Sequence, residues 1–223
     1  VKTIVTTDIA AKIAEEYGVK LIEVLTGFKF IGEQIGFLED KGQEDRYIFG
    51  FEESYGYLAG SYVRDKDAVV ASMLICEMAA FYRTKGISLI QARENMYKKY
   101  GVYVHSQSSF VCEGVTGMER MKEIMSDLRT NTPKTIGGLT VTRFEDYLAS
   151  TSVDTATGAK TMLTLPKSDV LTFKLTDGAS VIIRPSGTEP KIKAYYTTTG
   201  TTKAEASALE KTISDDFAKI LGF

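Results

Sequence analysis

The residue types best suited to chemistry gather in one segment near the C-terminal end, with the sequence Arg-Pro-Ser-Gly-Thr-Glu-Pro from Arg184 to Pro190. A phosphate group is bound well by a guanidinium, by short hydroxyls and by free backbone N–H groups in a concave turn. Arg184, Ser186, Gly187 and Thr188 supply all of these groups. Glycine also lets the backbone approach an anion closely. From the residues alone, an anion site and a plain β-turn are equally good interpretations.

A second candidate segment follows a predicted strand and reads Gly-Phe-Glu-Glu-Ser-Tyr-Gly-Tyr from residue 50 to 57. The carboxylates of Glu52 and Glu53 and the hydroxyl of Ser54 suit the vicinal hydroxyls of a sugar, and Tyr55 and Tyr57 add aromatic faces with polar tips. Neighbouring side chains on an extended chain point to opposite sides, which argues against two carboxylates flanking one glycosidic bond. A solvated acidic turn is the alternative interpretation.

Two further segments carry weaker signals. Thr26 and Gly27 come just before a predicted helix, where backbone N–H groups attract anions, although ordinary helix-start chemistry explains them as well. The run from Arg64 to Asp67 precedes a long predicted helix. Its Lys66 could bind an anion or donate a proton, whereas Asp67 is more simply the helix N-cap. A solvated charge run is the simpler interpretation of this segment.

Composition excludes several classes of protein. With 27 basic and 29 acidic residues among 223, the net charge is −2, which argues against a general nucleic-acid surface. We also expect no membrane partner, because no apolar run approaches the roughly 18 residues of a membrane span. Two cysteines and one histidine exclude a disulfide framework and a multi-histidine metal site. Reduced thiols and the lack of a signal segment predict a cytoplasmic protein.

The elements that must position these residues differ between the two halves of the chain. Strands predicted at 2–6, 20–25 and 46–51 alternate with helices at 8–17 and 29–38, which is typical of an α/β layer with parallel strands. Helices follow over 67–83 and from Ser88. The second half predicts antiparallel strands with helices at either side. The expected fold is therefore an α/β domain followed by an antiparallel-sheet α+β domain, with the boundary near Gly101.

Local signals define parts of this prediction more closely. Asp-Gly at 177–178, between strands over 170–175 and 180–184, predicts a hairpin. Capping boxes are predicted at Ser88, Thr116 and Thr202, each with Gln or Glu three residues later. The polar segment from 150 to 160 is predicted to be a mobile loop. Two apolar helical stripes are expected to pack in the core. The first consists of residues 68, 71, 75, 78 and 82, with Cys76 nearby, and the second of residues 118, 121, 125 and 128.

Together, the segments at 26–27, 50–57, 64–67 and 184–190 resemble the α-D-phosphohexomutase family, over essentially the whole chain. Within that family, the bacterial phosphoglucomutase branch is the most similar. Tyr57 stands where the phosphomannomutase branch has a histidine, which argues against that branch. The chain resembles the later part of the family's third domain, followed by the whole fourth domain. The resemblance implies a partial three-layer-type α/β domain (1–103) followed by an antiparallel-sheet α+β domain (104–223). A chain that begins with Val1 rather than Met fits the expectation that preceding domains are missing.

The resemblance implies roles for individual residues. Glu52 and Ser54 are expected to bind the O3 and O4 hydroxyls of the sugar, and Thr26 and Gly27 to lie in the cleft near the substrate. Lys66 is expected to assist catalysis by proton transfer or phosphate binding. The residues expected to hold the phosphate that is not transferred are Arg184, Ser186, Gly187 and Thr188.

The reaction implied by the resemblance interconverts glucose 1-phosphate and glucose 6-phosphate through glucose 1,6-bisphosphate and an enzyme phosphoserine, with Mg²⁺. The family's Thr-Ala-Ser-His-Asn-Pro serine loop and Asp-Gly-Asp-Gly-Asp-Arg metal loop do not occur in this sequence. We therefore expect no metal ligand in this chain, and no activity from it alone. Mannose or pentose phosphate substrates, a stand-alone phosphosugar-binding module and a glycoside hydrolase using Glu52 remain alternatives.

Overall fold

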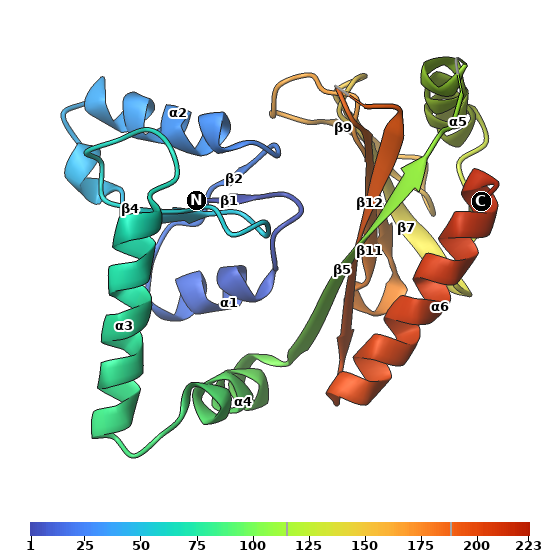
Figure 1. Ribbon diagram of the computed structural model, residues 1–223. Helices are drawn as coiled ribbons and strands as arrows, with labels where there is room; N and C mark the ends of the chain where they lie inside the picture. Colours follow the sequence, from blue (N-terminus) through green and yellow to red (C-terminus); the bar gives the residue numbers. More distant parts are fainter. Residues whose placement is uncertain (115, 188) are drawn as a thin grey trace. The chain divides into compact units, whose positions relative to one another are not determined.

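The computed structural model describes residues 1–114, 116–187 and 189–223. The chain forms two compact units, Val1–Gly101 and Val102–Phe223 (Figure 1). The first unit is an α/β layer and the second is an antiparallel α+β layer, so the fold class predicted from the sequence is confirmed. The predicted domain limits, 1–103 and 104–223, stay a prediction. In the described part of the chain, every helix is too short or too polar to cross a bilayer.

The first unit is built on a mixed sheet with the strand order β2-β1-β3-β4. Strand β1 pairs in parallel with β2 and β3, and β3 pairs antiparallel with β4. Because β1 lies between β2 and β3, right-handed crossovers place α1 and α2 on opposite faces of the sheet (Figure 1). The strands are β1 (Lys2–Thr3), β2 (Glu23–Val24), β3 (Phe49–Phe51) and β4 (Tyr57–Ala59), and the helices are α1 (Ile9–Glu16) and α2 (Phe28–Glu39).

Close packing around α2 forms the core of this unit. Ile31 and Ile35 are fully buried on one face of α2 and pack with Leu58 of β4. Gly32 is required on the same helix, because a Cβ there would lie 2.3 Å from the carbonyl oxygen of Arg64. A short 3-10 helix, η1 (Glu44–Arg46), leads into β3 in place of the start of the predicted strand.

The helices α3 (Ala68–Thr84) and α4 (Leu89–Tyr100) complete the first unit. Asp67 caps α3 by accepting hydrogen bonds from the N–H groups of Val69 and Val70. Every residue of both helices is described, and none is buried. The prediction that an apolar stripe of α3 packs in the core is therefore wrong for this chain, because nothing in the first unit covers it. Ile75 is 50% exposed, and Cys76 is exposed as well.

The second unit is an antiparallel sheet with the order β5-β12-β11-β10-β7-β8-β9, and β6 pairs with β7. Two helices, α5 (Gly117–Thr130) and α6 (Lys203–Leu221), share one core cluster with the sheet and so cover the same face. The strands are β5 (Val102–Val111), β6 (Thr135–Ile136), β7 (Leu139–Asp146), β8 (Thr151–Asp154), β9 (Lys160–Met162), β10 (Leu171–Leu175), β11 (Ser180–Pro185) and β12 (Lys191–Gly200).

Three details of the second unit correct the sequence-based predictions. The segment predicted as a mobile loop forms the hairpin of β8 and β9. Thr116 precedes α5 but, within the described residues, its side chain makes no capping hydrogen bond. Met118 is 47% exposed, although Met121 and Met125 of the same stripe are buried. The stripe therefore packs in the core from Met121 onward and not at Met118, although the neighbouring Gly117 is buried.

Candidate functional site

Residues 52–56 form a tight turn between β3 and β4. The N–H of Glu52 donates to the carbonyl oxygen of Gly56 at 2.9 Å, and Tyr55 takes a left-handed conformation with φ of 65°. Glu52 is buried at 9% exposure, whereas Tyr55 is 87% exposed and Ser54 is exposed as well. The turn therefore directs one carboxylate inward and presents a hydroxyl and an aromatic ring to solvent.

Glu52 meets two of the other predicted site segments. The backbone N–H of Gly27, just before α2, donates to Glu52 Oε1 at 3.0 Å. Lys66 approaches from the loop before α3, and a Cβ on Gly56 would lie 3.0 Å from both Glu52 Oε2 and the Cδ atom of Lys66. Gly27, Glu52 and Lys66 thus form one group in the first unit, with Gly56 allowing the close approach.

Electrostatics distinguish the two charged members of this group. Burial raises the pKa of Glu52 above its usual value, and the hydrogen bond from Gly27 and the charge of Lys66 oppose that rise. The Lys66 ammonium pairs with Asp65 at 2.9 Å, and this hydrogen bond raises the pKa of Lys66. The same ammonium lies 5.6 Å from the centre of the Phe28 ring. The group therefore offers one acceptor and one cation to a polar ligand.

Glu53 has different partners from its neighbour. Its Oε2 atom lies 3.4 Å from the hydroxyl of Thr3 and 3.5 Å from that of Thr6. These two hydroxyls lie 2.7 Å apart at the end of β1. Separate partners for adjacent carboxylates agree with the alternation of an extended chain. Glu53 therefore ties the turn to β1, a role that the sequence analysis did not assign to it or to the two threonines.

The Arg184 segment connects β11 to β12 in the second unit. The N–H of Ser186 donates to the carbonyl oxygen of Lys191 at 2.8 Å, and the N–H of Glu189 donates to Ser186 Oγ at 3.3 Å. Pro190 accepts a hydrogen bond from the N–H of Cys112 at 2.8 Å, which ties the loop to the end of β5. Gly187 is exposed, and a Cβ there would find no described atom within 4 Å. Thr188 lies outside the described residues.

Arg184 is oriented by a residue that the sequence analysis missed. Its Nε and Nη2 atoms donate to the hydroxyl of Tyr195 at 3.3 and 3.0 Å. Tyr195 is buried on β12, two residues beyond Lys193, which is the cross-strand partner of Arg184. The alternation of a strand places residues two apart on one face, so Tyr195 is expected beside Arg184 once the register of β11 against β12 is known.

The structure therefore groups the predicted residues by unit. Gly27, Glu52 and Lys66 come together in the first unit, with Thr26 and Ser54 adjacent to them in the chain, while Arg184, Ser186 and Gly187 belong to the second. Residues 1–114, 116–187 and 189–223 include no cluster of three or more His, Cys, Asp or Glu side chains that could hold a metal ion.

Two family models match this chain. Residues 1–100 match the alpha/beta/alpha domain III of phosphoglucomutase/phosphomannomutase, and residues 125–215 match the C-terminal domain of the same family. The chain belongs to the phosphoglucomutase/phosphomannomutase family. The resemblance found in the sequence, to the C-terminal part of this family, is thereby confirmed.

Curated relatives support this membership. A phosphoglucomutase of Staphylococcus aureus (strain bovine RF122 / ET3-1) is 39% identical over 195 residues, which are 87% of this chain and 35% of the relative. The phosphoglucomutase of strain MRSA252 is 38% identical over the same lengths. The chain thus spans about 35% of the length of these relatives.

A solved structure has the same fold. It is the open form of the Paramecium phosphoprotein pp63/parafusin, a phosphoglucomutase, with a TM-score of 0.68 and 20% identity. The match covers 99% of this chain and 37% of that chain.

Proposed function

We propose that this chain is the C-terminal part of a phosphoglucomutase, which interconverts glucose 1-phosphate and glucose 6-phosphate through glucose 1,6-bisphosphate and an enzyme phosphoserine. The observation that carries this proposal is the group around Glu52. A buried carboxylate is held by the backbone N–H of Gly27, and the Lys66 side chain lies close to it. A carboxylate accepts hydrogen bonds from sugar hydroxyls, and an ammonium attracts phosphate.

Each predicted residue has a role in this proposal. Glu52 and Ser54 bind the O3 and O4 hydroxyls, which stay near the middle of the sugar when its two ends exchange places. One turn can therefore serve both orientations of the bisphosphate. Thr26 and Gly27 border the sugar site, and Gly27 fixes the carboxylate of Glu52. Lys66 balances the charge of a phosphate or moves a proton at the reacting oxygen.

The loop between β11 and β12 holds the phosphate that is not transferred. A guanidinium and short hydroxyls match the oxygens of a phosphate, and the positive charges of Lys191 and Lys193 add to the local potential. The loop's ligands in this proposal are Arg184, Ser186, Gly187 and Thr188. Catalysis then relies on positioning and electrostatics, since phosphoryl transfer demands little covalent chemistry from the protein.

The domain limits follow the same assignment. Residues 1–103 would be the later part of domain three, with the sugar-binding turn, and residues 104–223 would be domain four, with the phosphate-binding loop. The phosphoserine and the Mg²⁺ ligands would belong to preceding domains, because the family's serine loop and metal loop do not occur in this sequence. Glucose 1,6-bisphosphate would then be the cofactor of the longer protein, and this chain alone would be inactive.

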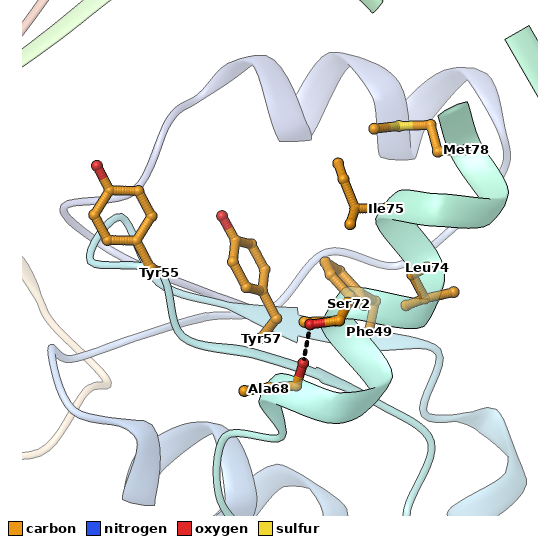
Figure 2. Close-up of a pocket in the computed structure, with 9 residues that line it drawn as sticks. Phe49, Tyr55, Tyr57, Ala68, Ser72, Leu74, Ile75 and Met78 are labelled. Atoms are coloured by element: carbon orange, nitrogen blue, oxygen red, sulfur yellow. Dashed lines mark hydrogen bonds between the residues drawn. The ribbon is translucent and has the colours of Figure 1, made fainter. Parts of the chain in front are cut away.

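An apolar groove supports the proposal that preceding domains are partners of this chain. It has a volume of about 600 Å³ and lies between the β3–β4 hairpin and α3 (Figure 2). Figure 2 shows Phe49 and Tyr57 of the hairpin beside Ile75 and Met78 of the helix. The curated relatives are longer than this chain, so residues preceding it in a longer protein are the proposed cover of this groove.

The proposed location is the cytoplasm, and the proposed ligand is a phosphosugar rather than a nucleic acid or a membrane. Both cysteines, Cys76 and Cys112, are free thiols, as is usual in a reducing compartment. The net charge of −2 offers no basic excess to attract nucleic acid or anionic lipid.

The proposal is tested by NMR titration of the chain with glucose 1-phosphate and with glucose 1,6-bisphosphate. We expect weak, saturable shifts at the 52–56 turn and at the Arg184 loop. Glu52→Ala should weaken the first set of shifts and Arg184→Ala the second. Arg93→Ala, which removes an exposed arginine paired with Glu94, is the control and should change neither. Absence of shifts at both loops with millimolar ligand would contradict the proposal.

A further inference from the structure

Tyr195 makes the closest described polar contacts of the Arg184 guanidinium. Two of the guanidinium donors, Nε and Nη2, converge on the single hydroxyl oxygen at 3.3 and 3.0 Å. The guanidinium carbon also lies 5.7 Å from the centre of the Tyr195 ring. The tyrosine therefore contacts the arginine through its hydroxyl, and its ring lies within the range of a cation–π interaction.

Tyr195 is itself held firmly in place. It is 5% exposed and lies in the middle of β12. That strand pairs on one side with β11, where Ile182 is the partner of Tyr195, and on the other side with β5, where Gln107 is the partner. A side chain on a strand that is paired on both sides gives the longer, partly buried arginine a rigid reference point.

An arginine side chain has many rotamers, and ordering it on binding costs free energy. A partner that orders it beforehand reduces that cost. The guanidinium carries five N–H donors, so the two that meet Tyr195 leave the fork with further donors for a phosphate. A tyrosine hydroxyl is an uncharged acceptor, so it orders the guanidinium without cancelling its charge as a carboxylate would.

We propose that Tyr195 is a positioning residue for phosphate binding: its hydroxyl holds the Arg184 guanidinium in the orientation in which it meets the phosphate of a sugar phosphate. This inference rests on the proposed function, because it takes the Arg184 loop as the phosphate site. It adds a residue outside the loop to that site and assigns the role to one atom, the phenolic oxygen.

The test compares Tyr195→Phe, which removes only the hydroxyl, with Tyr196→Phe. Tyr196 is the next residue and lies in the core on the opposite face of the sheet, so its variant controls for loss of a buried phenol from the same strand. Binding of glucose 1-phosphate is measured by NMR titration, and the Nε–H resonance of Arg184 is followed without ligand. Each variant is also made with Arg184→Ala.

We expect Tyr195→Phe to weaken binding about fivefold, the equivalent of one hydrogen bond of about 1 kcal/mol, and to shift the Arg184 Nε–H resonance. Tyr196→Phe should do neither. In the Arg184→Ala protein, Tyr195→Phe should have no further effect on binding. The inference would be overturned if Tyr195→Phe left the affinity unchanged, or if it weakened binding equally in the Arg184→Ala protein. Either result would leave the phosphate-site assignment standing. Failure of the unsubstituted chain to bind at this loop would overturn the phosphate-site assignment and the inference with it.

Discussion

Glu52 is the residue whose ionisation most directly links the proposed site to stability. Burial raises its pKa above the usual value for glutamate. As the pH rises, the unfolded chain loses this proton first, while the folded chain retains it to a higher pH. The folded state then binds more protons than the unfolded state, so this residue lowers the free energy of unfolding as pH increases across that interval. Above the raised pKa of Glu52 in the folded state, the loss of unfolding free energy caused by this carboxylate is complete.

Glu52→Gln removes the ionisation and keeps an oxygen that accepts the hydrogen bond from Gly27. We expect the midpoint of thermal unfolding of this variant to rise relative to the unsubstituted protein as the pH is raised from 4 to 7. Melting curves in matched buffers measure this difference. Ser54→Ala, which alters the same turn without changing charge, should follow the unsubstituted protein at each pH. A constant difference between Glu52→Gln and the unsubstituted protein would contradict the assigned cause.

Arg129 of α5 joins two carboxylates of the second unit. Its Nε atom lies 3.0 Å from Asp146 Oδ2, and its Nη2 atom lies 2.5 Å from Asp169 Oδ1. The Asp146 side chain is 9% exposed and also accepts hydrogen bonds from the N–H groups of Leu148 and Ala149. Removing the arginine would leave a largely buried carboxylate without its cation.

We expect Arg129→Met to lower the free energy of unfolding by about 3 kcal/mol, the lower end of the range for breaking a buried pair, because the Arg129 side chain is 22% exposed. Arg120→Met breaks an exposed pair with Glu123 on the same helix and should cost less than about 1 kcal/mol. Urea unfolding of the two variants gives the comparison. Equal losses would show that the Arg129 contacts behave as a surface pair.

At the scale of elements, the start of α6 is well defined. The Thr202 hydroxyl accepts a hydrogen bond from the N–H of Glu205, and the Glu205 side chain accepts one from the N–H of Thr202. Thr202→Ala should therefore cost about 1 kcal/mol in the unfolding of the second unit. Thr212→Ala removes an exposed hydroxyl within the same helix and should cost nothing, because alanine favours helix. Similar urea midpoints for both variants would contradict a capping role.

The elements predicted correctly are those whose cause is local. The Asp-Gly turn between β10 and β11 has positive φ at Asp177 and Gly178, as such a hairpin requires. The capping boxes at Ser88 and Thr202 form between residues three apart, within the first turn of a helix. The hairpin of β8 and β9 was missed because its strands are polar, and their pairing depends on β7.

The candidate site was predictable to the extent that it consists of sequence motifs. Glu52 and Gly27 were each identified in the sequence, but their hydrogen bond joins residues 25 apart, and no local pattern predicts it. Tyr195 was missed because its link to Arg184 depends on the register of β11 against β12. The chemistry of single residues was thus readable, whereas their pairing required the fold.

For the whole molecule, the two units differ in how much apolar surface they bury. The second unit has a continuous core between its sheet and two helices. In the first unit, α3 exposes large apolar side chains such as Val69 and Phe81. We expect faster amide exchange across residues 1–60 than across the strands β10 to β12, because opening of the first unit exposes less additional apolar surface. Hydrogen exchange followed by mass spectrometry measures this, and uniform protection would contradict it.

The pairing of β5 with β12 has a consequence for synthesis on the ribosome. The edge strand β5 is complete at Val111, but its partner begins only at Lys191. At about 5–20 residues per second, translation of the roughly 80 intervening residues takes about 4–16 s. During that time the nascent strand has no partner in its own sheet. Its centre reads His-Ser-Gln-Ser-Ser, and so polar a segment resists pairing with neighbouring nascent chains until β12 emerges.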